Sequence, residues 1–386
     1  MSENEIYQQL EELCQSNGAL DVVERLISFL TSKGRYHELF EALKMRTRLR
    51  LGLSAAQADQ QERFDEDTEH QLELGLLDAC RQVGKGLLSQ GKIREGWMYL
   101  RPVGDRGEAA RLFGQIEATD ENQDELLEVL LHEGVDTRRG YKLALDRLGT
   151  CNSITLFEQV LASRPRSDQQ VAAELLVRHV YRELQENLRY DISRREAQEP
   201  PAGETIEQLL SARPDLLKDG TYHLDTSHLA STVRFARVLD DPEALAQALD
   251  IAQYGRRLHP QYQYPGEEPF LDLYPASIAF FRALLGQQTD AAIKYFSRKA
   301  DMVSQAEYGT VANEVLIDML SRVGMHEQAL TAFEKRIPAD ARLMGIAPTL
   351  LQLSQRLGSY EHMQRICQQR DDLLGFAAAL MRHAKD

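Results

Sequence analysis

Long apolar runs and paired cysteines are both missing from this chain. No stretch of its 386 residues approaches the roughly 18 apolar residues that cross a bilayer. The acidic first residues lack the basic stretch and apolar core of a signal peptide. The four cysteines are scattered, with no pair at the spacing of a metal or redox motif. These absences predict a cytoplasmic protein with reduced core thiols and no membrane contact.

Positive charge is also scarce, since 45 lysines and arginines face 60 acidic residues, for a net charge of −15. An acidic surface repels phosphate backbones, so we expect no nucleic-acid partner. Apolar residues make up 43% and charged residues 27%, which is ordinary for a folded chain. The length exceeds what one compact core holds, which predicts several domains or one elongated array.

Signature motifs of common enzymes are absent as well. The chain has no phosphate-binding glycine loop, no dinucleotide fingerprint and no nucleophile elbow. Their absence lowers the expectation of an enzyme without removing it, and no cofactor is expected.

Helical periodicity dominates what is present. Leu20, Val23, Leu26, Ile27 and Leu30 recur at steps of three and four residues, which is the spacing of one buried helix face. Alternating strand patterns are scarce, so the sequence predicts an all-α fold.

Glycine-containing turns with similar surroundings separate the predicted helices. Apolar segments precede and follow each turn, as expected where one helix ends and its antiparallel partner begins. The turns are centred on Gly34, Gly91, Gly286, Gly324 and Gly358.

The turn at Gly91 has the most regular surroundings. Ile93, Gly96 and Leu100 follow it at two, five and nine residues, and Gly84 lies in the preceding helix. A small residue lets two helix backbones approach, and a large residue fills the gap to the next hairpin. In this pattern the chain resembles the tetratricopeptide repeat family. The resemblance implies an α-α superhelix of antiparallel hairpins that binds a protein or peptide partner on its concave face.

The spacing between turns is irregular. Gly358 follows Gly324 by 34 residues, the period of the family, whereas Gly91 follows Gly34 by 57. Leu39 and Met363 replace the small residue in two turns. The repeats are therefore expected to be degenerate, over roughly residues 20–105 and 230–375, and other α-solenoid types remain possible.

Three segments interrupt the helical rhythm. Residues 53–72 are polar and acidic, which indicates a loop or an exposed helix start. Pro200 and Pro201 end any helix in 191–205, so this segment is predicted to be a linker. Four prolines exclude a regular helix from 259–275. The predicted organisation is an N-terminal helical-hairpin array (1–190), a linker (191–205) and a C-terminal array (206–386) that carries the aromatic loop 259–275.

A histidine-rich segment is the strongest candidate for chemistry. His223, Asp225 and His228 lie within six residues and could converge on a metal ion or act as an acid–base set. The alternative is structural, with Asp225 or Thr226 capping a helix that starts near Ser227.

Two residues of an earlier predicted helix could add ligands to this segment. His179 and Glu183 are four apart between Val171 and Arg189, so they share a helix face. The alternative is a solvated or salt-bridged face, since no catalytic motif accompanies the two residues.

The aromatic loop is the second candidate site. Its aromatic and polar side chains could line a pocket, or its aromatics could plug an apolar end of the array. Arg256 and His259 precede it and could hold a carboxylate, or they could complement the dipole of a helix end. The predicted ligand-binding residues are Arg256, His259, Tyr262, Tyr264, Phe270, Asp272 and Tyr274, with Glu267 and Glu268 as further polar contacts.

Two functions follow from these patterns. The first is an interaction scaffold that binds a protein or peptide, of unspecified oligomeric state. The second is an enzyme or small-ligand sensor, in which His223, Asp225 and His228 act beneath the loop 259–275. The repeated hairpins and the missing catalytic motifs favour the scaffold.

Overall fold

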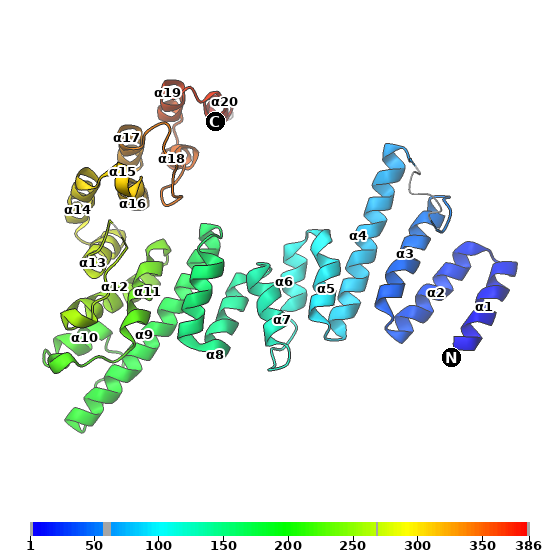
Figure 1. Ribbon diagram of the computed structural model, residues 1–386, viewed down its shortest axis with the longest axis horizontal. Helices are drawn as coiled ribbons and strands as arrows, with labels where there is room; N and C mark the ends of the chain where they lie inside the picture. Colours follow the sequence, from blue (N-terminus) through cyan, green and yellow to red (C-terminus); the bar gives the residue numbers. More distant parts are fainter. Residues whose placement is uncertain (1–2, 57–62, 268, 384–386) are drawn as a thin grey trace. The chain divides into compact units, whose positions relative to one another are not determined.

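The computed structural model describes residues 3–56, 63–267 and 269–383 (Figure 1). Over these ranges the chain forms twenty α-helices and no β-strand, which confirms the all-α prediction. No helix within these ranges is both long and apolar enough to cross a lipid bilayer.

Contacts along the chain divide it into two compact units, Met1–Arg147 and Leu148–Asp386. The first unit begins with a series of helices that each pack against the next, from α1 to α5. Its elements are α1 (Glu3–Ser16), α2 (Ala19–Lys33), α3 (Tyr36–Arg50), α4 (Glu66–Ser89), α5 (Ile93–Leu100), the 3-10 turn η1 (Arg101–Val103), α6 (Arg106–Phe113), α7 (Gln123–Leu127), the π-helical turn η2 (Glu128–His132) and the first part of α8 (Thr137–Leu156).

The glycine turns in this unit end helices as predicted. Gly34 follows α2 with a φ of 65°, a left-handed conformation that glycine adopts without the strain of a Cβ atom. The next amide, that of Arg35, donates to the carbonyl of Leu30, which closes the end of the helix. Leucines from α3 and α4, among them Leu39, Leu43 and Leu87, are fully buried between the packed helices.

Helices α4 and α5 approach each other closely at two glycines. A Cβ atom on Gly84 would lie 2.6 Å from the side chain of Leu100 and 3.0 Å from the carbonyl oxygen of Gly96. A Cβ atom on Gly96 would lie 2.6 Å from the side chain of Leu88. The two small residues therefore permit a helix crossing that any side chain would push apart.

The second unit begins within α8, where Gly149 has a φ of 76° and interrupts the helix. Its remaining elements are the π-helical turn η3 (Phe157–Leu161), α9 (Arg166–Glu196), α10 (Ile206–Ser211), η4 (Lys218–Gly220), α11 (Thr226–Phe235), η5 (Ala236–Val238), α12 (Pro242–Arg257), η6 (Pro260–Tyr262), α13 (Leu273–Leu284), α14 (Thr289–Met302), α15 (Gln305–Tyr308), α16 (Val311–Arg322), α17 (His326–Arg336), α18 (Leu350–Leu357), α19 (Glu361–Gln369) and α20 (Leu373–His383).

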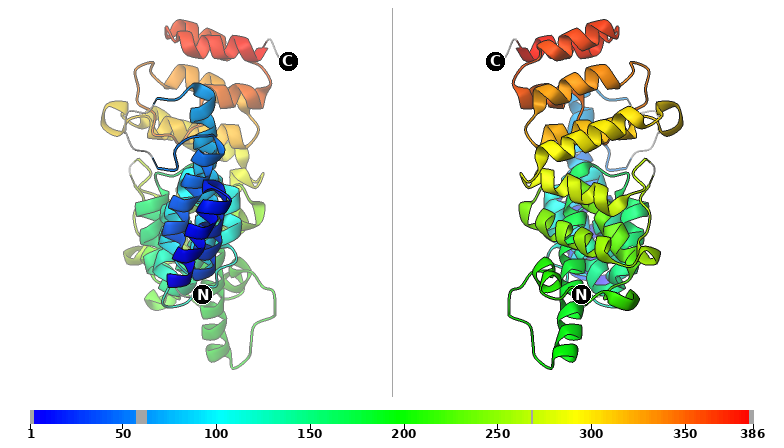
Figure 2. Two further views of the ribbon diagram at one scale, coloured as in Figure 1. Left: turned by 90° about the vertical axis from the view of Figure 1, so that its right-hand side faces the viewer. Right: turned by 90° about the vertical axis from the view of Figure 1, so that its left-hand side faces the viewer.

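Helices of the second unit stack one on another from α13 to α20, as the right-hand view of Figure 2 shows. Contacts join α13 to α14, α14 to α16, and each later helix to its successor. Before this stack, the 31-residue helix α9 packs against α10, α11 and α12. Nearly every residue of α16 is buried, including Asn313, Glu314, Asp318 and Ser321. A buried polar face is unusual for a helix.

The structure differs from the predicted division of the chain. The boundary between the two compact units falls between Arg147 and Leu148 in the sequence, whereas the expected linker 191–205 lies inside the second unit. Helix α9 continues to Glu196, beyond the predicted end at Arg189, and a short connection then leads to α10.

The other two irregular segments partly agree with expectation. Within 53–72, helix α4 begins at Glu66 behind the capping side chain of Asp65, and residues 57–62 lie outside the described ranges. The aromatic loop ends earlier than predicted, because α13 starts at Leu273. Pro275 lies in the first turn of this helix, where the missing N–H of a proline costs no helical hydrogen bond.

Candidate functional site

His223 is buried, with 4% of its side chain exposed, and both ring nitrogens have protein partners. Nε2 lies 3.0 Å from Asp191 and Nδ1 lies 3.1 Å from the hydroxyl of Tyr254. Burial lowers the pKa of His223, and the hydrogen bond to Asp191 only partly offsets this. Neither ring nitrogen is therefore left to bind a substrate or a metal ion.

Asp225 and His228 lie on the adjacent helix start without joining His223. The carboxylate of Asp225 accepts hydrogen bonds from the amides of Ser227 and His228, at 2.8 and 3.3 Å. These bonds cap α11 and lower the pKa of Asp225, with the hydroxyl of Ser227 contributing most. The structure therefore places Asp225 in the capping role that the sequence left open.

His179 and Glu183 form a separate pair on α9. Both approach the hydroxyl of Thr150, at 3.0 Å and 3.4 Å, and their own side chains are 4.0 Å apart. Asp191, the partner of His223, lies twelve residues further along this helix, a rise of about 18 Å. Among the described residues, no three His, Cys, Asp or Glu side chains gather as a metal site.

Two aromatic residues of the predicted ligand site belong to the core. Phe270 and Tyr274 are 2% and 1% exposed. The ring of Phe270 lies 5.7 Å from that of Phe296, and Tyr274 covers Gly255 so closely that a Cβ atom there would be 2.2 Å from it. These side chains fasten the loop to α12 and α14.

The remaining loop residues are dispersed. Asp272 accepts hydrogen bonds from Tyr295 and Lys299, at 2.5 and 3.2 Å. Tyr262 packs beside Tyr222 and His259, with ring centroids 5.1 and 6.3 Å away.

Four more residues of that prediction lie apart from any common site. Arg256 and His259 are exposed, and Tyr264 is 50% exposed. Glu267 pairs with Arg234 at 2.8 Å, and Glu268 lies outside the described residues.

A different part of the second unit brings charged side chains together. A pocket of about 600 Å³ is formed by the start of α9, the turn before α12, the inner face of α16, the start of α17 and the end of α18. It is lined by Arg166, Gln170, Asp240, Asp318, Ser321, Arg322, His326 and Arg356. We call this set the polar pocket.

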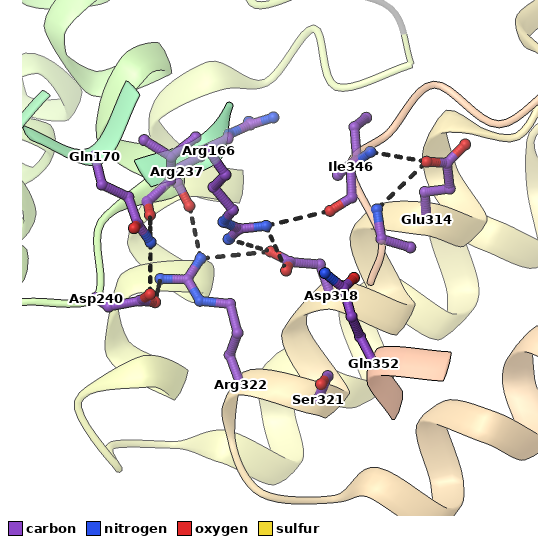
Figure 3. A network of polar contacts seen from close by, with 12 residues as sticks. Arg166, Gln170, Arg237, Asp240, Glu314, Asp318, Ser321, Arg322, Ile346 and Gln352 are labelled. Atoms are coloured by element: carbon purple, nitrogen blue, oxygen red, sulfur yellow. Dashed lines mark hydrogen bonds and ion pairs between the residues drawn. The ribbon is translucent and has the colours of Figure 1, made fainter. Parts of the chain in front are cut away.

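An ion-pair network forms one wall of the polar pocket (Figure 3). Arg166 binds both carboxylate oxygens of Asp318, at 2.9 and 3.2 Å. Arg322, with 7% of its side chain exposed, lies 3.0 Å from Asp240 and 3.4 Å from Asp318. The guanidinium of Arg322 also donates to the backbone carbonyls of Arg237 and Leu239. Burial lowers the pKa of Arg322, while the two aspartates act in the opposite direction.

Beside this network, α16 holds an irregular segment of the chain, residues 337–349. The residues between α17 and α18 form no helix, and Glu314 accepts hydrogen bonds from the amides of Met344, Ile346 and Ala347, at 2.7, 2.9 and 3.3 Å. Arg166 donates to the carbonyl of Ile346 at 3.3 Å. Side chains thus satisfy backbone groups that have no helix or strand partner, as Figure 3 shows.

The sequence did contain a signal for this site. Glu314, Asp318 and Arg322 follow one another at four-residue steps in a segment that is otherwise rich in aliphatic residues. That spacing places them on one helix face. Their partners Arg166 and Asp240 are distant in the sequence, so only the tertiary structure reveals the network.

Comparison with known protein families finds no family model that matches this chain, and comparison with curated proteins finds no matching protein.

Proposed function

We propose that this chain is a helical-repeat scaffold of the tetratricopeptide type, which binds a peptide or protein partner at the polar pocket. Helices of each unit pack mainly against their neighbours in the sequence, which is typical of solenoid proteins. The glycines at the α4–α5 crossing occupy positions where the family has small residues. The four free cysteines support a reducing compartment such as the cytoplasm.

The observation that carries this proposal is the irregular segment 337–349, whose backbone is held by side chains of α16 and α9. Glu314 and Arg166 bind its backbone amides and a carbonyl, and the hydroxyl of Thr310 lies 3.4 Å from the carbonyl of Arg342. Such contacts do not depend on the side chains of the bound stretch, and peptide-binding proteins use them to hold an extended ligand. These contacts within the chain support the proposal that this face binds a peptide.

The polar pocket continues this face toward solvent. Asp318 and Arg166 belong both to the network around the irregular segment 337–349 and to the wall of the pocket. Asp240 is 64% exposed at its edge, so an incoming ligand can reach the pocket. By contrast, His223 is buried and engaged with Asp191 and Tyr254, which gives the enzyme alternative no support.

A peptide selection followed by mapping tests the proposal. A synthetic library of random octapeptides, made with free and with amidated C-termini, would be captured on the purified full-length chain and sequenced. Enriched peptides would then be titrated by fluorescence anisotropy, and their footprint would be mapped by amide hydrogen exchange. We expect protection in the segments of α16 and α18 that line the polar pocket.

Two outcomes contradict the proposal. If the library yields no peptide above background, the chain is not a peptide-binding scaffold of this kind. If peptides bind but protect other helices, the function stands and the polar pocket is the wrong site.

A further inference from the structure

Hydrogen-bond donors outnumber acceptors in the polar pocket. Both oxygens of Asp318 are engaged by Arg166, and those of Asp240 are engaged by Gln170 and Arg322. Each carboxylate oxygen of the two aspartates therefore already has a donor.

Arg356 is the donor in excess. The single partner of its guanidinium among the described residues is the hydroxyl of Ser321, at 2.6 Å, although a guanidinium has five N–H groups. Arg356 is also exposed, so its remaining N–H groups are within reach of a ligand.

The balance of charge points in the same direction. Three arginines line the pocket, and its two aspartates pair with Arg166 and Arg322. Arg356 makes no ion pair with a described carboxylate, so the pocket has a net positive charge within a chain of net charge −15. Nδ1 of His326 is also buried without a hydrogen-bond partner among the described residues. A ligand that fits this surface brings acceptor atoms and negative charge.

We propose that the polar pocket binds a carboxylate of the partner peptide, and that Arg356 is the residue that recognises it. This inference rests on the proposed function and specifies the chemistry of the ligand. A guanidinium and a carboxylate form paired, charge-assisted hydrogen bonds, which are shorter and stronger than neutral ones. The carboxylate comes either from an Asp or Glu side chain or from the C-terminus of the peptide.

The octapeptide library provides the test. We expect the enriched peptides to contain Asp or Glu, or to require a free C-terminus. In the first case an Asp→Asn or Glu→Gln replacement in the peptide weakens binding by about tenfold or more, and in the second case amidation does so.

A charge reversal identifies the receiving residue. Arg356→Glu should weaken the enriched peptide by about tenfold or more, and should also abolish the difference between the acidic peptide and its amide counterpart. The amide counterpart should still bind the variant, whereas a general loss of structure would abolish the binding of both peptides. The matched control is Arg298→Glu, an exposed arginine on α14 outside the polar pocket, which should leave both affinities unchanged. Far-UV circular dichroism would check that both variants are folded.

Each other outcome has a definite meaning. Enriched peptides without carboxylate dependence, or an acidic preference that survives Arg356→Glu, overturn this inference and leave the scaffold proposal intact. A library that yields no binder at all contradicts the scaffold proposal itself.

Discussion

At the scale of single residues, burial decides what His223 does. Its imidazole bridges Asp191 on α9 and Tyr254 on α12, and the carbonyl of His223 accepts a hydrogen bond from Asn187. Asp191 also binds Arg195 at 2.7 Å. Burial would raise the pKa of Asp191, but the bonds from His223 and Arg195 outweigh it and lower the pKa. The cluster therefore joins helices through an ionised carboxylate and a neutral imidazole.

This arrangement predicts a pH dependence of stability. Because the pKa of His223 is lowered in the folded chain, the unfolded chain binds a proton first on acidification. The contribution of His223 is thus complete above about pH 6.5 and is lost as the pH falls below that value. We expect the free energy of unfolding to fall less between pH 7.5 and 5.5 in His223→Gln than in the wild type. Over this window the difference is at most about 1.4 kcal/mol, because the unfolded chain takes up the proton over only about one pH unit below pH 6.5.

Urea denaturation at both pH values measures this effect. His259→Gln, which removes an exposed histidine from the same unit, serves as the control and should retain the wild-type slope. Equal slopes for the wild type and His223→Gln would show that the imidazole does not titrate differently on folding. Asp191 does not complicate the comparison, because its lowered pKa keeps it ionised over this range.

At the scale of helices, close approach at glycine determines how hairpins pair. We expect Gly96→Ala to destabilise the first unit by about 1–3 kcal/mol, because the new methyl group would overlap the side chain of Leu88. Gly107→Ala is the matched control. Gly107 lies in the first turn of α6, and a Cβ atom there meets only an oxygen of Asp105, at 3.6 Å. That variant should be neutral or more stable, because alanine favours a helix. Thermal unfolding of both variants tests this prediction. Equal melting temperatures for Gly96→Ala and Gly107→Ala would contradict the packing argument.

The irregular segment 337–349 beside α16 offers a second test at this scale. Glu314→Gln removes a charge and an acceptor oxygen from a fully buried position that receives three backbone amides. We expect a loss of about 1–3 kcal/mol in stability. We also expect faster hydrogen exchange at Met344, Ile346 and Ala347. Glu307→Gln, at an exposed position on α15, should change neither quantity. Unchanged exchange at the three amides in Glu314→Gln would show that the carboxylate does not hold the segment.

At the scale of the whole molecule, the two compact units predict where the chain can be divided. A fragment of residues 148–386 keeps α9 together with the helices that it contacts, so we expect it to fold and unfold cooperatively. A fragment of residues 206–386 lacks α9, whose buried Leu176, Val180 and Leu184 would leave an exposed apolar face behind. We expect that fragment to melt at a lower temperature or to aggregate.

Circular dichroism melts of the two fragments measure the difference. A stable, helical 206–386 fragment with the melting temperature of 148–386 would support the division that the sequence suggested at 191–205. The shorter fragment also lacks Arg166, which lines the polar pocket, so peptide binding by this fragment provides a separate test of that pocket.

Local features of the chain were predictable because they depend on neighbouring residues. Apolar residues at steps of three and four specified helices, and glycines such as Gly34 and Gly358 ended them in left-handed conformations. Two prolines marked a helix-free stretch after α9, although they could not show that it lies within a unit. The spacing of Gly84 and Gly96 from Gly91 also anticipated a close helix crossing.

The candidate sites depended instead on contacts between distant residues. Asp225 was correctly named as a possible cap, since a cap involves only the next few amides. His223 could not be assigned, because its partners Asp191 and Tyr254 are about thirty residues away on either side. The polar pocket was missed because Arg166 meets Asp318 only when α9 and α16 come together. Local backbone preference and periodicity were enough to specify the helices and their ends. Which of the charges pair depends on contacts between helices that are distant in the sequence, and Arg356 makes no ion pair with a described carboxylate.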